Sequence, residues 1–173
     1  MKVLVTGGAG YIGSHTCVEL LAQGHEVIIF DNFYNSSPDV IEKIEEISGK
    51  SVKLIEADMC DAAAVDKAFA ENEIDCIIHF AGLKAVGESV AKPVFYYDTN
   101  IGGTINIVKA MQKYGVKKLV FSSSATVYGM NNVAPYNETM PTSATNPYGW
   151  TKLMIEQILT DTAKAQGDWH IAL

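Results

Sequence analysis

The sequence predicts an α/β fold built on a doubly wound parallel sheet, and three observations support this. Short apolar runs rich in β-branched residues alternate with longer amphipathic segments, which is the order of strands and crossover helices in a parallel sheet. A glycine-rich turn at residues 6–13 joins the first apolar run to the first amphipathic segment. The chain has 173 residues, of which 48% are hydrophobic, enough for one domain that buries roughly 70% of its unfolded surface. We therefore expect a single domain over residues 1–173.

Six strands are expected from the apolar runs. They span residues 2–6, 26–30, 52–56, 76–80, 119–123 and 169–173. Each of the first five is too apolar for a half-exposed edge strand, so we expect these strands to be buried on both faces of the sheet. The sixth run ends the sequence, and in open α/β sheets the substrate pocket is usually completed by later segments. We therefore expect the C-terminal, substrate-binding half to be absent from this chain.

Helices are expected between the strands. The first would bury Ile12, Thr16 and Leu20 and end at Gly24. The others are identified by apolar residues on one helical face or by a terminal residue: Val40, Ile44 and Ile47 before Gly49; Ala64, Val65, Ala68 and Phe69 after the cap Asp61; Tyr97, Ile101, Ile105, Val108 and Met111; and a last helix from about Tyr148 to Gln166.

Composition and charge exclude several classes of function. The formal net charge is -7 with acids and bases interspersed, and no basic run could follow a phosphate backbone, so we expect no nucleic-acid partner. Cys17, Cys60 and Cys76 match no zinc-binding spacing, so we expect no metal and three reduced core thiols. No apolar run approaches the ~20 residues of a membrane span, and a strand beginning at Lys2 leaves no room for a signal sequence. We expect a soluble cytoplasmic protein with no membrane partner.

The glycine turn is the first candidate binding site. Gly8, Gly10 and Gly13 give the pattern Gly-x-Gly-x-x-Gly, and Gly7 begins a second, overlapping pattern. The turn follows a strand and opens a helix, where glycines let a pyrophosphate approach backbone N–H groups at the positive helix end. The alternative is a tight strand-to-helix turn that binds nothing.

The second strand is followed by an acidic residue, Asp31, which stands 18 residues after Gly13. Its carboxylate could accept hydrogen bonds from both hydroxyls of an adenosine ribose, whereas it would repel the 2′-phosphate of NADP. No Arg or Lys lies between Asp31 and Ile41, so the sequence favours NAD. Asp58 closes the third strand and could accept a hydrogen bond from the adenine amino group. The alternative for both residues is an ordinary acid at a turn or strand end.

Tyr148 and Lys152 form the candidate catalytic pair. Their i, i+4 spacing places both side chains on one helix face. A free phenol, with a pKa near ~10, is a poor base at neutral pH, and a cation at ~4 Å would stabilise its phenolate. The serine-rich run at 121–129 leaves the fifth strand beside the expected crevice, where a hydroxyl could bridge a substrate oxygen to the phenol. Alternatively, Tyr-x-x-x-Lys arises by chance and these serines only cap or turn the chain.

Four segments taken together, at 6–13, 79–89, 121–129 and 148–152, closely resemble the extended short-chain dehydrogenase/reductases. Within them, the block at 80–89 resembles the UDP-galactose (UDP-glucose) 4-epimerase family. The resemblance implies a Rossmann-like NAD-binding domain and a UDP-sugar substrate. Tyr148 would take the proton of the sugar 4-hydroxyl while hydride passes from C4 to NAD, and the 4-keto sugar would turn over and be reduced on its other face. Lys152 would support Tyr148 and hold the nicotinamide ribose, and Ser124 would bond the sugar oxygen and help relay the proton.

The resemblance also implies a set of binding residues. Substrate contacts would come from Lys84, Ser124 and Tyr148. Cofactor contacts would come from Tyr148 and Lys152 and from the residues that match the family's other cofactor-binding positions: Gly7, Gly10, Tyr11, Ile12, Gly13, Asp31, Asn32, Phe33, Tyr34, Asn35, Ser36, Asp58, Met59, Phe80, Ala81, Gly82, Lys84, Asn100 and Ser122.

Two further expectations follow from the resemblance. Related 4,6-dehydratases carry an Asp-Glu acid/base pair after the strand-five hydroxyl, whereas this chain has Ala125-Thr126, so dehydration is disfavoured. The helices at 97–111 and 148–166 resemble those through which the family forms homodimers, and Gly102-Gly103 would permit close packing of two helices; alternatively, these helices only cover the sheet. The competing hypothesis for function is a non-catalytic NAD-binding module on the same fold.

Overall fold

The computed structural model describes residues 1–173 and contains one six-stranded sheet in which every strand pair is parallel. The strand order is β3-β2-β1-β4-β5-β6, so the order reverses between β1 and β4. This is the predicted doubly wound topology, and each predicted strand is present with its ends shifted by no more than two residues. The strands are β1 (Lys2–Thr6), β2 (Glu26–Asp31), β3 (Lys53–Glu56), β4 (Cys76–His79), β5 (Lys118–Phe121) and β6 (His170–Ala172).

Seven α-helices and two short helical turns connect the strands. Asp61 caps α3 as predicted, since its carboxylate accepts hydrogen bonds from the N–H groups of Ala63 and Ala64. The helices are α1 (Tyr11–Ala22), α2 (Asp39–Ser48), α3 (Ala62–Ala70), α4 (Val86–Ala91), α5 (Pro93–Tyr97), α6 (Gly103–Tyr114) and α7 (Pro147–Gln166), and the turns are the π-helical η1 (Asp98–Gly102) and the 3₁₀-helical η2 (Ala125–Tyr128).

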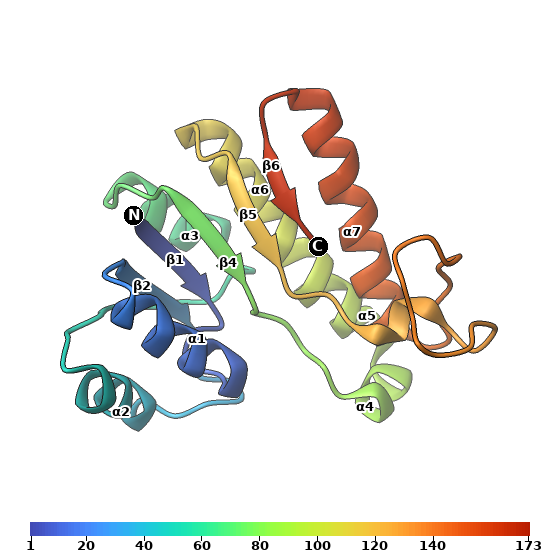
Figure 1. Cartoon of the computed structure of the whole chain (residues 1–173), viewed down its shortest axis with the longest axis horizontal. Coiled ribbons are helices and arrows are strands. Elements are labelled where there is room, and N and C mark those ends of the chain that lie inside the picture. Colours follow the sequence, from blue (N-terminus) through green and yellow to red (C-terminus); the bar gives the residue numbers. More distant parts are fainter.

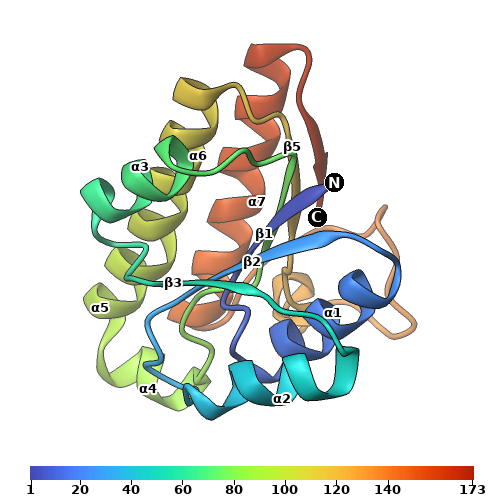
Figure 2. The same ribbon diagram turned by 90° about the vertical axis from the view of Figure 1, so that its left-hand side faces the viewer.

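The helices form two layers, one on each face of the sheet (Figure 1, Figure 2). α1 and α2 cover one face of β1 and β2, where Val5 and Cys17 belong to the same apolar core. α3, α6 and α7 cover the opposite face, where a larger core joins Leu4 of β1 to Ile107 of α6 and Ile155 of α7. The carboxyl ends of the strands and the amino ends of α1 and α7 therefore meet at one edge of the sheet.

The expectation that the first five strands are buried on both faces is wrong for β3 and β5. β3 lies at the edge of the sheet, and its four residues are half-buried or exposed. In β5, Leu119 and Phe121 are buried in the larger core, whereas Val120 on the opposite face is 41% exposed. The physical reason is that the layer formed by α1 and α2 does not extend over β5.

The predicted buried stripe of α1 is wrong by one residue. α1 buries Gly13, Cys17 and Leu21 instead of Ile12, Thr16 and Leu20, and Ile12 is 55% exposed. The reason is the close approach of the helix to the preceding turn: a Cβ atom at Gly13 would lie only 2.2 Å from the carbonyl oxygen of Gly7. The residue that can face the turn is therefore a glycine, and it fixes the rotation of the helix.

The single helix predicted around Tyr97 to Met111 consists of α5, η1 and α6 in direct succession. The side chain of Thr104, in the first turn of α6, donates at 2.6 Å to the carbonyl of Asn100 in the widened π-helical turn. At Gly103, a Cβ atom would lie 2.5 Å from Cγ of Met59. Gly103 therefore permits a close contact between α6 and the Met59 side chain of the same chain.

The three cysteines are free thiols in different environments. Cys17 is buried as predicted and Cys76 is partly buried, but Cys60 is exposed, so the expectation of a core thiol is wrong there. Cys60 lies in the loop after β3, where its N–H donates to the Asp58 carboxylate at 2.8 Å. This hydrogen bond keeps the residue at the surface.

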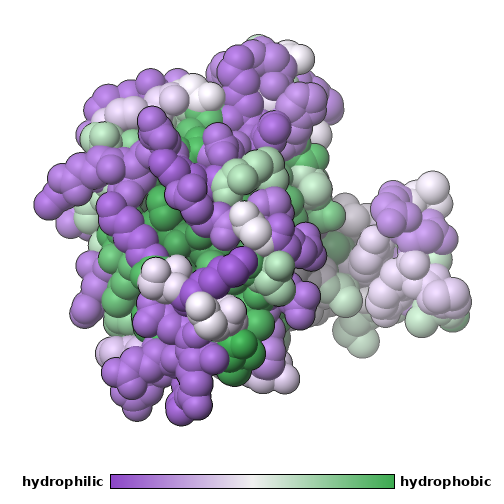
Figure 3. Space-filling model, turned by 60° about the vertical axis from the view of Figure 1, so that its left-hand side comes forward, coloured by the Kyte–Doolittle hydropathy of each residue, from purple (hydrophilic) through white to green (hydrophobic).

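The segment between η2 and α7 extends away from the body of the molecule (Figure 3, at the right). Its apolar side chains Met130 and Val133 are exposed, and Asn132 ties it together by donating to the carbonyls of Tyr128 and Pro141. None of the helices has both the length and the apolar composition that crossing a membrane requires. No group of three or more His, Cys, Asp or Glu side chains is arranged to hold a metal ion.

Candidate active site

A cavity of about 510 Å³ lies at the carboxyl ends of the central strands, where the strand order reverses. Its wall includes Tyr148, Lys152 and Lys84, and every residue expected to bind the cofactor except Phe33 and Asn100. Ser124, an expected substrate contact, is also outside the wall. The wall further contains residues that sequence reasoning missed: Phe30, Ala57, Leu83, Phe95, Thr99 and Ser123.

The missed residues fall into two groups. Four of them are direct neighbours of expected positions: Phe30, Ala57, Leu83 and Ser123. Because they lie at strand ends or in the loop after β4, the sequence could have predicted them as part of the wall. Thr99 of η1 is likewise the neighbour of Asn100, whereas Phe95 of α5 has no expected position beside it. Only the folded chain brings Phe95 to the cavity.

The glycine turn forms one end of the cavity. Gly7 has a φ of 70°, and a Cβ atom there would lie 2.6 Å from the backbone nitrogen of Ala81. α1 begins after Gly10, which offers no side chain to cap the first-turn N–H groups. These N–H groups and the positive end of the helix dipole favour an anion such as a pyrophosphate.

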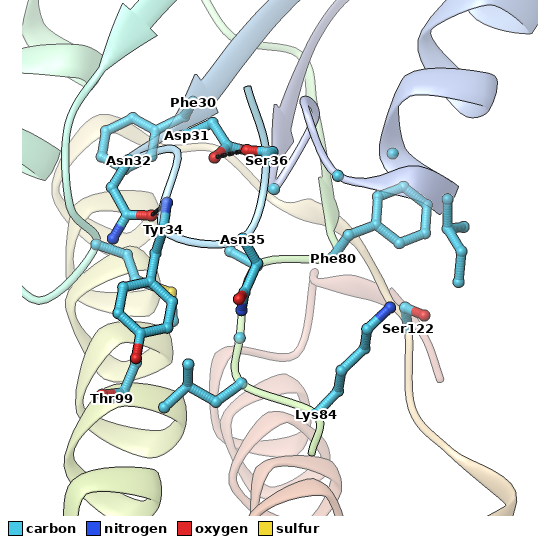
Figure 4. A pocket seen from close by; sticks show the side chains of 18 of the residues that line it. Phe30, Asp31, Asn32, Tyr34, Asn35, Ser36, Phe80, Lys84, Thr99 and Ser122 are labelled. Atoms are coloured by element: carbon cyan, nitrogen blue, oxygen red, sulfur yellow. Dashed lines mark hydrogen bonds between the residues drawn. The ribbon is translucent and has the colours of Figure 1, made fainter. Parts of the chain in front are cut away.

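Asp31 is buried, yet its carboxylate lines the cavity. Oδ2 accepts from the N–H of Ala9 at 3.0 Å, and Oδ1 accepts from the N–H of Phe33 at 2.9 Å and from the Ser36 hydroxyl at 3.1 Å. Figure 4 shows the Asp31 and Ser36 side chains meeting at the cavity. Phe33 therefore contributes its backbone, in a left-handed conformation with φ 55°, and its side chain is not part of the wall.

Asp58 lies at the far side of the cavity from Ser122 and Tyr148. Its Oδ2 accepts from the Asn32 amide at 2.9 Å, and its Oδ1 accepts from the N–H of Cys60 at 2.8 Å. Partial burial opposes ionisation, but the hydrogen bonds from Cys60 and Asn32 outweigh it and hold the pKa of Asp58 below its usual value. Asp58 is thus an ionised hydrogen-bond acceptor in the wall.

Tyr148 and Lys152 occupy the other end of the cavity. They are 9% and 6% exposed, and the Tyr148 ring packs against Leu83 and Tyr96. The Lys152 Nζ lies 6.0 Å from the centre of the Tyr148 ring and donates to the carbonyl of Ser122 at 2.9 Å. Burial lowers the Lys152 pKa to about 8, although the nearby Glu156 carboxylate acts in the opposite direction. Lys152 is therefore still largely protonated at neutral pH.

The serine-rich loop after β5 is attached to α7 at two points. Lys152 bonds the Ser122 carbonyl, and the Ser123 hydroxyl donates to the Glu156 carboxylate. Ser124 instead caps η2: its hydroxyl oxygen accepts from the Thr126 N–H at 3.3 Å and from the Thr126 hydroxyl at 3.0 Å. Because both acceptor positions of the oxygen are occupied, the remaining capacity of Ser124 is to donate its proton.

A chain of buried polar side chains connects the glycine turn to α6. His79, at the end of β4, is fully buried and its ring contacts Thr6 at Nδ1 (2.6 Å) and Thr104 at Nε2 (2.9 Å). The Thr104 hydroxyl already donates to the Asn100 carbonyl, so Nε2 must carry the imidazole proton and Nδ1 must accept from Thr6. Burial and the nearby Lys152 charge lower the His79 pKa to about 3, which keeps this ring neutral.

The same chain continues to α7 through Asn100. The Asn100 amide accepts from the Leu83 N–H at 2.8 Å and donates to the Leu83 carbonyl and to the Thr151 hydroxyl, each at 3.0 Å. Thr151 in turn donates to the carbonyl of Tyr148 at 2.6 Å. Asn100 therefore braces the cavity wall at Leu83 against the helix that carries Tyr148.

The two ends of the cavity suit the two ends of a dinucleotide. One end offers backbone N–H groups to a pyrophosphate and a fixed carboxylate to a ribose, and the other brings a phenol and an ammonium group to the place where a reactive ring would lie. Fold and site are those of an α/β domain of the dinucleotide-binding class. Comparison with known proteins gives the family: the NAD dependent epimerase/dehydratase family model matches residues 3–172, and the chain belongs to this family.

Individual relatives are similar over the whole chain. UDP-glucose 4-epimerase of Bacillus subtilis (strain 168) is 60% identical over 173 residues, which are 100% of this chain and 51% of that protein. The solved structure of UDP-glucose 4-epimerase from Bifidobacterium longum in complex with NAD+ and UDP has a TM-score of 0.97 and 55% identity, over 99% of this chain and 51% of that chain. The UDP-Glc/GlcNAc 4-epimerase of Campylobacter jejuni follows with a TM-score of 0.94 and 37% identity, over 98% of this chain and 51% of that chain. The chain thus spans about half the length of the relatives it matches.

Proposed function

We propose that this chain is the NAD-binding domain of an isomerase that interconverts UDP-galactose and UDP-glucose through a transient 4-keto sugar, a reaction of galactose metabolism. The observation that supports this best is the presence of Tyr148 and Lys152, both buried, in the cavity that also contains the glycine turn and Asp31. A module that only binds nucleotide has no need for a buried phenol and ammonium at the reactive end. Relatives up to 60% identical bear the name UDP-glucose 4-epimerase.

The residues present fit NAD. A Cβ at Gly7 would collide with the backbone of Ala81 and one at Gly13 with the carbonyl of Gly7, so only glycine allows the tight turn that places the first N–H groups of α1 at the cavity. Asp31 is held by three donors with its carboxylate at the cavity, where it would accept from ribose hydroxyls. Lys84 extends toward Ser122 across the cavity (Figure 4), where its charge would meet a phosphate or a sugar oxygen.

The reaction needs a base at the sugar 4-hydroxyl and a return of the same proton. NAD, when bound, would supply reversible hydride acceptance at the sugar C4, with the hydride returned to the opposite face of the 4-keto sugar. Tyr148 would accept the 4-hydroxyl proton as a phenolate and return it to the 4-keto oxygen, so no net oxidation results. The buried Lys152 ammonium would stabilise that phenolate, and the carbonyl of Ser122 keeps Nζ in place. Burial excludes water, which strengthens this interaction between charges.

Ser124 would act as a hydrogen-bond donor to the sugar oxygen. Thr126 fills its acceptor positions, so the Ser124 hydroxyl is left to donate. The residues after Ser124 are Ala125 and Thr126, neither of which can serve as the acid or base that an elimination requires. Epimerisation is therefore favoured over dehydration, although the family includes both reactions by name.

The whole protein would have a substrate-binding half outside this chain and a dimer interface on its helices. We assign the UDP-binding, substrate half to a region outside residues 1–173, because the chain spans about half the length of its relatives. The helices at 97–111 and 148–166 would pack in a homodimer, where Trp150 and Met154 of α7 are exposed. Three unpaired thiols suit the reducing cytoplasm as the site of action.

A coupled assay for UDP-glucose formation from UDP-galactose tests the proposal. The full-length protein is expected to turn over substrate, whereas residues 1–173 alone are expected to bind NAD with little or no turnover. Positioning the sugar C4 depends on binding the remote UDP group, and lost orientation forfeits several kcal/mol of barrier lowering. A full-length protein that holds NAD but does not interconvert these substrates would support the binding-module alternative.

Cofactor choice is a separate test. NAD(H) is expected to bind this chain more tightly than NADP(H), because the Asp31 carboxylate would repel a 2′-phosphate and no Arg or Lys lies between Asp31 and Ile41. Fluorescence titration with both cofactors measures the preference. Equal affinities would remove Asp31 from the ribose site.

A further inference from the structure

Aromatic side chains line the end of the cavity that lies away from the reactive groups. At the side away from Ser122, the wall is formed by Tyr34 of the loop after β2, Asp58 and Met59 of the loop after β3, and Phe95 and Thr99 of α5 and η1. These segments lie together in the fold, because the Asn32 amide bonds Asp58 at 2.9 Å and the Cys60 Sγ lies 3.8 Å from the Thr99 carbonyl.

Tyr34 and Phe95 form an edge-to-face pair across this end. Their ring centres are 6.3 Å apart with the planes at 61°, which is within the range of favourable aromatic contacts. Both rings line the cavity, and they remain 56% and 40% exposed. In Figure 4 the Tyr34 ring lies between Asn32 and Thr99. A flat aromatic group in the cavity would cover this exposed apolar surface.

The backbone holds Tyr34 in this position by two successive side-chain hydrogen bonds. Phe33 donates its N–H to Asp31 Oδ1 at 2.9 Å, and Tyr34 donates its N–H to Asn32 Oδ1 at 3.0 Å. Between them Phe33 adopts a φ of 55°, a left-handed conformation that is costly for a residue other than glycine and that persists when its surroundings enforce it. The carboxylate expected at the ribose therefore also orients the loop that presents Tyr34.

We propose that Tyr34 and Phe95 form an aromatic clasp on the adenine base of the bound dinucleotide and set how slowly the nucleotide dissociates. The inference rests on the proposed function only in taking the ligand to be an adenine dinucleotide. The base would follow the ribose from Asp31 toward Asp58, whose ionised carboxylate can accept from the adenine amino group while the two rings contact the faces and edge of the base. An aromatic contact at this position holds the nucleotide without touching the reacting end.

The test uses Tyr34→Ala and Phe95→Ala in this chain, with Tyr34→Phe as the conservative variant. Val94→Ala is the matched control, because Val94 is exposed on the same helix as Phe95 and is not part of the cavity wall. Each alanine variant is expected to weaken NAD and ADP-ribose by about 5-fold to 100-fold, the range of base–aromatic stacking, through faster dissociation in stopped-flow measurements. Tyr34→Phe and Val94→Ala should stay within about twofold of the parent, and nicotinamide mononucleotide should be unaffected throughout.

The outcomes separate the clasp from the proposed function. Alanine variants that release ADP-ribose as slowly as the parent, with the parent binding NAD, would contradict the clasp alone. An equal loss of affinity for nicotinamide mononucleotide would also contradict it, because the rings would then act through the whole cavity. A parent chain that binds neither NAD nor ADP-ribose would contradict the proposed function and the clasp together. All three positions are exposed, and thermal unfolding checks that each of the four variants folds.

Discussion

The glycine turn and the first turns of α7 face the same cavity, but they are built in opposite ways. The turn offers backbone only: Gly7, Gly10 and Gly13 have no side chain, and a Cβ added at Gly13 would lie 2.2 Å from the Gly7 carbonyl oxygen. α7 acts through large side chains, Tyr148 and Lys152, which are almost fully buried. A side chain added in the glycine turn would clash with backbone, whereas shortening Tyr148 or Lys152 would remove a reactive group.

This difference shows where each region gets its stability. The turn is closed by local backbone hydrogen bonds, such as that from the Gly10 N–H to the Gly7 carbonyl at 3.1 Å. Lys152 depends on contacts that come from far along the chain, the carbonyl of Ser122 and the Asn100–Thr151 bond that fixes its helix. A buried ammonium is costly without such partners. The turn is therefore stabilised by local contacts, and the reactive end by contacts between residues far apart in the sequence.

The largest expected effect separates the two regions by function. In the full-length protein, Tyr148→Phe removes the base and Lys152→Met removes the charge that stabilises its phenolate, so each should lower turnover by about 10²-fold to 10⁴-fold. NAD affinity of Tyr148→Phe should change little, because the glycine turn is intact. Steady-state kinetics and NAD titration measure both quantities. Either variant with near-parental turnover would exclude that residue from the mechanism.

The next effect breaks the glycine turn. Gly13→Ala places a Cβ against the Gly7 carbonyl, and backbone cannot move aside cheaply, so the free energy of unfolding should fall by about 1–3 kcal/mol and NAD affinity should fall with it. Gly87→Ala is the matched control, since a Cβ there meets no atom within 4 Å. Denaturant unfolding and NAD titration are the measurements. A Gly13→Ala chain as stable as the Gly87→Ala chain would refute the steric account of the turn.

The third effect concerns the charge of Lys152 and is confined to alkaline pH. Its pKa is lowered from 10.5 to about 8 in the folded chain, so between these pH values only the unfolded chain holds the proton. The free energy of unfolding should therefore gain up to about 3 kcal/mol as pH rises from about 8 to 10.5, with none of this gain present at neutral pH. Urea unfolding of the parent and of Lys152→Met across this range isolates the contribution. Two curves that stay parallel would mean that Lys152 is not desolvated.

Sequence patterns were sufficient wherever function depends on local geometry. The strand-turn-helix order around the glycines, the acid after β2 and the i, i+4 spacing of Tyr148 and Lys152 predicted the two ends of the cavity, and the family resemblance supplied most of the wall between them. The predictions that were wrong concern which residues are buried, because that depends on tertiary packing. α1 is rotated by one residue because Gly13 faces the turn, and Cys60 is exposed because Asp58 binds its N–H. Neither contact has a signature in the periodicity of the apolar residues.

The sequence by itself determined the six strands of a parallel sheet and the chemistry available at its carboxyl edge, because glycine conformation, helix capping and side-chain period act between residues close in the chain. Only the tertiary structure decided which of those residues face one cavity. It brings Phe95 and Thr99 beside Tyr34, places Ser124 as a cap outside the wall, and joins Thr6 to Thr104 through a neutral His79. The reason is that these contacts connect groups far apart in sequence, and their energies depend on burial that exists only after the sheet and both helical layers have assembled.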